Sequence, residues 1–168
     1  MLTLHTKLPY APDIHATLVL AYDQREKCRL RARLDTGEEV AIFMVRGSVL
    51  RHGDLLTGED GRVVRVIAAQ EATYVVRCED QQTLARCAYH LGNRHTQVAI
   101  GDKLLRIRVD PVLKEMVLGL GATVSEQLAA FEPEQGAYAG GHSHREDSLL
   151  APVPLRQKIH RPGDLVEP

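Results

Sequence analysis

Apolar and polar residues alternate along much of the first 70 residues. Between Lys27 and Asp35 an apolar residue stands at every second position (Cys28, Leu30, Ala32, Leu34), the pattern of a β-strand with one buried and one solvated face. Val40–Val45 is apolar throughout and predicts a strand covered on both faces. Val63–Ile67 predicts a further strand. Turn-forming residues separate these stretches at Asp35–Gly37, His52–Asp54 and Gly58–Gly61. Short strands at this spacing predict a small β-barrel or sandwich domain over residues 1–70.

The periodicity changes after residue 70. Ala72–Cys78 has the composition of a strand, and Asp80 can cap a helix that Gly92 ends. The apolar residues of this helix follow the i, i+3, i+4, i+7 spacing (Leu84, Cys87, Ala88, Leu91). Two short strands, Thr96–Ile100 and Lys103–Val109, are expected next, joined by a turn at Gly101–Asp102.

A second helix is predicted from Asp110, which can act as its cap, to Gly121, with Pro111 in the first turn. Residues 122–131 are then expected to form the last strand. The order β-α-β-β-α-β is typical of a ferredoxin-like domain, predicted here for residues 71–139. The fold class is therefore α+β, and residues 140–168, where the apolar pattern disappears, are expected to form a flexible tail.

Composition narrows the function classes. The 168 residues include 21 Lys+Arg and 22 Asp+Glu, a net charge of −1, so no bulk charge attracts nucleic acid or anionic lipid. No apolar run approaches the roughly 20 residues that span a bilayer. Three cysteines cannot all pair, and the N-terminus lacks a signal-peptide pattern. We therefore expect a soluble cytoplasmic protein.

Histidines are the candidate chemical groups, because the chain has no common catalytic motif. Neutral imidazole is a frequent ligand of Zn, Cu and Ni. His142 and His144 form a His-x-His pair in the predicted tail, which is either solvated or a weak, reversible chelate. His95 follows the first predicted helix on an exposed connection, where spacing alone does not decide its role. His90, near the end of that helix, fits a capping or supporting role better.

Three stretches of the second half stand out: residues 89–95 (YHLGNRH), residues 104–120 with Asp110 at the helix start, and residues 131–138 (FEPEQGAY). In their order and spacing they resemble the UreE urease accessory protein family of nickel metallochaperones. The resemblance implies a non-enzymatic homodimer with a β domain of the peptide- or partner-binding type and a ferredoxin-like domain. It further implies that His95 is a Ni²⁺ ligand at the dimer interface and that His142 and His144 add further ligands. The implied task is delivery of Ni²⁺ to apo-urease with the accessory GTPase UreG and the complex of urease apoprotein and accessory proteins.

The chain also departs from this family. Some members carry metal-binding histidines on both sides of the aspartate that matches Asp110, where this chain has Val109 and Pro111, so that peripheral site is expected to be absent. Its tail offers only His142, His144 and the distant His160, so few ions per dimer are expected. Zn²⁺ or Cu²⁺ can bind the same ligands as Ni²⁺. Cys78 matches a cysteine that binds metal in some members, although a small buried residue is the favoured interpretation.

Two other functions remain to be weighed. An RNA-binding or other partner-binding module would need stacking aromatics and positive charge, whereas aromatic residues make up 4% of the chain. A zinc hydrolase would need three fixed ligands with a base beside them, and no such spacing is present. A basic stripe (Lys27, Arg29, Arg31, Arg33) is usually solvated; otherwise we expect it to face an acidic partner surface.

Overall fold

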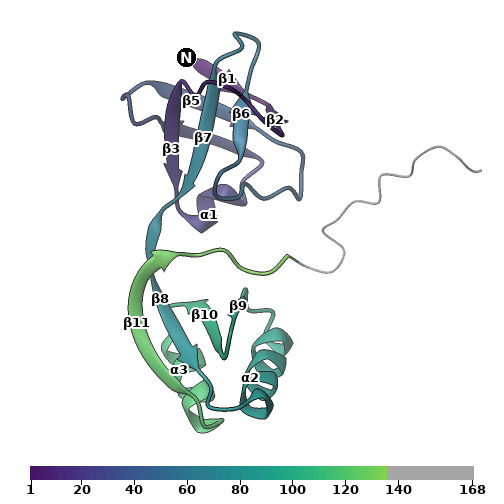
Figure 1. The fold of residues 1–168 in the computed structure, drawn as a ribbon, viewed down its shortest axis with the longest axis vertical. Helices are drawn as coiled ribbons and strands as arrows, with labels where there is room; N and C mark the ends of the chain where they lie inside the picture. The colour runs from purple at the N-terminus through teal and green to yellow at the C-terminus, as the bar shows by residue number, and fades with distance from the viewer. Residues whose placement is uncertain (136–168) are drawn as a thin grey trace, which may run out of the picture.

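The computed structural model describes residues 1–135. The first domain consists of two sheets (Figure 1). One has the strand order β1-β5-β4, from β1 (Leu2–Leu4), β4 (Arg29–Arg33) and β5 (Glu39–Phe43). The other has the order β2-β6-β7-β3, from β2 (Thr6–Leu8), β3 (Ala16–Leu20), β6 (Leu55–Thr57) and β7 (Val63–Ala68). A short helix, α1 (Tyr22–Arg25), follows β3.

The two sheets pack around one apolar core. Leu4 and Ile42 from the first sheet lie in the same buried cluster as Leu18, Leu56 and Val66 from the second. Gly58 permits a close approach at one corner, because a Cβ atom there would lie 1.8 Å from the carbonyl oxygen of Thr3. Of the two predicted forms, the described residues form the sandwich, since neither sheet closes on itself.

The sequence patterns missed several elements of this domain and misjudged one. Strands β1, β2, β3 and β6 and helix α1 were not assigned. Val40–Val45 is not covered on both faces along its length, because Phe43 is 47% exposed and Val45 78% exposed. The strand ends at Phe43, and its last apolar side chains face solvent.

The second domain has the ferredoxin-like order, as predicted. It contains β8 (Gln70–Arg77), α2 (Gln81–Asn93), β9 (Ala99–Gly101), β10 (Leu104–Arg108), α3 (Pro111–Gly119) and β11 (Thr123–Ala130). The antiparallel sheet has the order β11-β8-β10-β9. Leu91 of α2 and Val117 of α3 are fully buried against Val76 and Ile107 of the sheet.

Local signals explain both helices. Asp80 accepts a hydrogen bond from the Thr83 N–H (2.7 Å), and Asp110 accepts from Val112 N–H (2.8 Å) and Leu113 N–H (3.0 Å), which satisfies N–H groups that lack a partner within the helix.

Several boundaries in this domain differ from the predicted ones. Helix α2 passes through Gly92 and ends one residue later. Strand β9 begins at Ala99 instead of Thr96, and the hairpin turn falls on Asp102 and Lys103. Lys103 supplies the left-handed conformation of that turn, with φ 52°.

A buried arginine joins the two domains. Arg25 of α1 is 0% exposed and donates to the Leu50 carbonyl (3.2 Å), the Phe131 carbonyl (2.6 Å) and the Glu132 carboxylate. Arg51 also donates to the Pro133 carbonyl (2.8 Å). The segment after β11 therefore turns back and runs between the domains (Figure 1).

Candidate functional site

His95 lies directly after helix α2, in an unusual backbone conformation. Its φ of 53° is left-handed, a region that glycine occupies easily and that costs other residues roughly 1 kcal/mol or more. The His95 N–H donates to the Gly92 carbonyl (2.9 Å), and the Thr96 N–H donates to the Leu91 carbonyl (3.2 Å). This pair of bonds is the Schellman motif, with a histidine where glycine is preferred.

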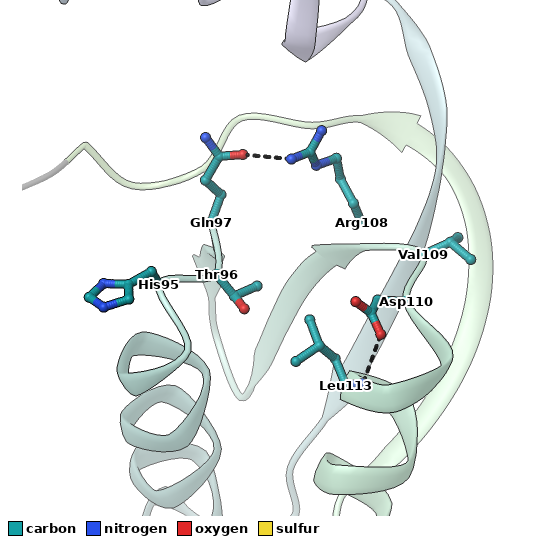
Figure 2. Close-up of a pocket in the computed structure, with 7 residues that line it drawn as sticks. All are labelled: His95, Thr96, Gln97, Arg108, Val109, Asp110 and Leu113. Carbon is teal, nitrogen blue, oxygen red and sulfur yellow. Dashed lines mark hydrogen bonds between the residues drawn. The ribbon is translucent and has the colours of Figure 1, made fainter.

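The motif determines where the imidazole points. His95 is exposed, and its ring extends outward from the end of α2, away from Asp110 and Arg108 (Figure 2). Its backbone is held through Leu91, which is fully buried. The exposed connection predicted for His95 is confirmed, and its backbone is anchored to the helix end.

A surface hollow of about 490 Å³ adjoins His95. Its lining comes from the connection after α2, the end of β10 and the start of α3 (His95, Thr96, Gln97, Arg108, Val109, Asp110, Leu113). Arg108 donates to the Gln97 side-chain oxygen (3.2 Å), as Figure 2 shows, and the Gln97 amide donates to Glu26 of the first domain (2.5 Å). The wall of the hollow is thus linked by hydrogen bonds to the first domain.

Sequence reasoning missed Gln97 and Arg108 at this site. They are separated along the chain by the β9–β10 hairpin, and nothing in their local pattern distinguishes them from other surface polar residues. Only the pairing of β9 with β10 brings them together.

One imidazole cannot hold a metal ion by itself. Within residues 1–135 no three His, Cys, Asp or Glu side chains come together in a group that could hold a metal ion, as a fixed hydrolytic zinc site would require. His142, His144 and His160 lie outside the described residues. Further ligands for an ion on His95 must therefore come from residues beyond 135 or from another molecule.

Other candidate residues have structural positions. Cys78 is 5% exposed, as expected of a small buried residue, and burial raises the pKa of its thiol. His90 is exposed on the last turn of α2, with its ring edge-to-face against Tyr89 at 5.4 Å. The strands of the sheet in the second domain carry one aromatic residue, Tyr74, which is buried against the helices and so offers no stacking platform for RNA.

The fold and the site define a two-domain α+β protein whose ferredoxin-like second domain presents an exposed imidazole at a helix end. None of the helices within residues 1–135 has the length and apolar character needed to cross a membrane. Comparison with known proteins then identifies the family.

Residues 4–69 match the family described as UreE urease accessory protein, N-terminal domain, and residues 71–160 match its C-terminal domain. A urease accessory protein UreE of Janthinobacterium sp. strain Marseille is 61% identical over 175 residues, covering 99% of this chain and 100% of the relative. One from Nitrosospira multiformis is 57% identical over 173 residues, covering 98% of each. The chain belongs to the UreE urease accessory protein family.

Proposed function

We propose that this protein serves urease assembly as a nickel-binding metallochaperone that delivers Ni²⁺ to apo-urease in the cytoplasm. The observation that carries the proposal is His95: an exposed imidazole on an anchored helix end, in a backbone conformation that histidine adopts at a cost. Unusual backbone conformations persist where the surrounding structure holds them, often at functional sites. Membership of a urease accessory protein family supports Ni²⁺ as the metal and apo-urease as the recipient.

The site is completed by a second copy of the chain. Within residues 1–135, a single protomer brings together no group of three His, Cys, Asp or Glu side chains that could hold an ion. Two His95 side chains meeting across a two-fold axis would bind one ion equally. Exposed apolar side chains beside the hollow support such a contact, since Val109 is 44% exposed and Val112 66% exposed. The functional unit is therefore a homodimer.

His142 and His144 of the tail complete the ligand shell in this proposal. They lie at least seven residues beyond Gln135, the last described residue, so they can exchange without disturbing the helix end that carries His95. A partner such as the accessory GTPase UreG, or the complex of urease apoprotein and accessory proteins, can displace them and accept the ion. Zn²⁺ and Cu²⁺ compete for the same imidazoles.

A calorimetric Ni²⁺ titration with a mass measurement tests the proposal. The variants are His95→Ala, a chain ending at Ala139, and His90→Ala as the control, because His90 is also an exposed histidine and lies on the last turn of the helix that precedes His95. We expect about one Ni²⁺ per dimer for the parent and for His90→Ala, weaker binding after truncation, and no binding by His95→Ala. Binding should also weaken between pH 8 and pH 5.5, because a protonated imidazole cannot bind a metal ion. Unchanged binding by His95→Ala would overturn the proposed site.

A further inference from the structure

Strand β4 is the edge of the first sheet. In the order β1-β5-β4 it pairs with β5 alone, so within residues 1–135 its other side has no strand partner. An open edge can accept an additional strand from another molecule. What β4 can accept depends on the groups that it presents there.

The hydrogen-bond pattern shows which backbone groups face outward. The Met44 N–H donates to the Cys28 carbonyl (2.7 Å) and the Leu34 N–H donates to the Glu38 carbonyl (2.9 Å). Hydrogen-bonded pairs alternate along an antiparallel ladder. The backbone N–H and C=O groups of the even-numbered residues of β4 therefore bond to β5, and those of the odd-numbered residues point away from β5. The odd-numbered residues are Arg29, Arg31 and Arg33. Their backbone N–H and C=O groups make no hydrogen bond to the described part of the chain.

The same three residues bear the charge of the strand. Their side chains are exposed on the outer face of the sheet. Arg33 pairs with Glu39 at 3.3 Å, whereas Arg29 and Arg31 form no ion pair within residues 1–135. Phe43 lies opposite Arg29 and is 47% exposed. Together they border a shallow hollow of about 290 Å³.

The inner side of β4 is apolar and incompletely covered. Leu30 and Ala32 pack against the core of the first domain. They remain partly exposed because, within the described residues, no strand lies beside the open edge of β4. The edge therefore presents alternating cationic and apolar positions, together with unused backbone donors and acceptors.

We propose that β4 binds an extended acidic segment of a partner protein, in which acidic and apolar residues alternate. Added as an antiparallel strand, such a segment places carboxylates beside Arg29 and Arg31 and apolar side chains over Leu30 and Ala32. The same charges repel a second copy of β4, which would set arginine against arginine. The inference is independent of the metal site.

Fluorescence anisotropy with a labelled peptide, Glu-Val-Glu-Leu-Glu-Val-Glu, tests this docking on the full-length protein. We expect saturable binding that Arg29→Glu/Arg31→Glu weakens about tenfold or more. Arg65→Glu is the control, because Arg65 is an exposed arginine on β7 of the other sheet. Thermal unfolding of each variant checks that the domain remains folded.

Three further probes separate strand addition from charge attraction alone. A peptide of the same composition with its glutamates in one block should bind weakly, and so should one whose alternate amides are N-methylated. An oligouridylate of equal charge should not compete. Equal binding of the block peptide, the methylated peptide or the oligouridylate would overturn the proposal, as would the absence of binding or a loss of binding by Arg65→Glu as large as that by Arg29→Glu/Arg31→Glu.

Discussion

The contact between Arg25 and Glu132 yields the sharpest stability prediction. Arg25 is 0% exposed, whereas the side chain of Glu132 is 33% exposed. The Arg25 guanidinium also lies 5.2 Å from the centre of the Tyr22 ring, and its Nε has no hydrogen-bond partner within residues 1–135. Among residues 1–135, the Glu132 carboxylate is the anionic group that contacts this buried cation, so Glu132→Gln removes the charge compensation while keeping the shape.

The expected cost follows from the burial of the cation. Breaking a buried ion pair by neutralising one partner costs about 3–5 kcal/mol. Because Glu132 is partly exposed and the Phe131 and Leu50 carbonyls still accept from Arg25, we expect Glu132→Gln to lower the free energy of unfolding by about 2–3 kcal/mol.

Urea unfolding followed by circular dichroism measures this loss. Glu134→Gln is the matched control, since Glu134 is exposed and, within residues 1–135, hydrogen-bonds only through its backbone N–H, which donates to the Val98 carbonyl (2.8 Å). Arg25→Met/Glu132→Gln completes a double-mutant cycle with each single variant. The double variant no longer buries an uncompensated charge. Its loss of unfolding free energy should therefore be smaller, by at least about 1 kcal/mol, than the sum of the losses in the two single variants. A loss below about 0.5 kcal/mol for Glu132→Gln, or additive single losses, would refute this account of the interdomain contact.

Three more predictions concern single groups. His95→Gly relieves the left-handed strain and should raise the free energy of unfolding by about 0.5 kcal/mol while abolishing Ni²⁺ binding; a destabilised variant in thermal unfolding would contradict it. Burial raises the pKa of Cys87 to about 11, so a thiol reagent at pH 8 should label the partly exposed Cys28 first and Cys87 only after unfolding. Hydrogen bonds from the Thr17 N–H (3.0 Å) and hydroxyl (2.8 Å) lower the pKa of Asp35. Its stabilising contribution is therefore present above about pH 4 and lost on acidification, so Asp35→Asn should cost less stability at pH 3 than at pH 7.

The second domain was largely predictable because its signals are local. Asp80 and Asp110 each stand directly before a helix whose apolar spacing is regular, and each accepts the hydrogen bonds expected of a cap. The first domain was harder, because β1 and β3 pair in parallel with strands more than 35 residues away and each is too short to show a clear period.

The burial of Arg25 was not predictable from its surroundings in the chain. Asp23 and Glu26 flank it, a composition typical of a solvated segment. Its burial depends on Phe131 and Glu132, more than 100 residues away. A buried arginine of this kind becomes visible only when both domains are assembled.

The end of helix α2 shows that a glycine alone does not predict where a helix ends. Gly92 was predicted to stop the helix, yet the left-handed residue is His95, and Gly92 instead accepts the His95 N–H through its carbonyl. A stop at Gly92 would leave His95 on a free connection, where its position would vary. In the observed ending the His95 backbone is bonded to a helix whose Leu91 is fully buried, and positioning a ligand before binding lowers the entropy cost of binding. In the proposed function, the anchored His95 therefore retains the ion, while the tail histidines are the ligands that a recipient displaces.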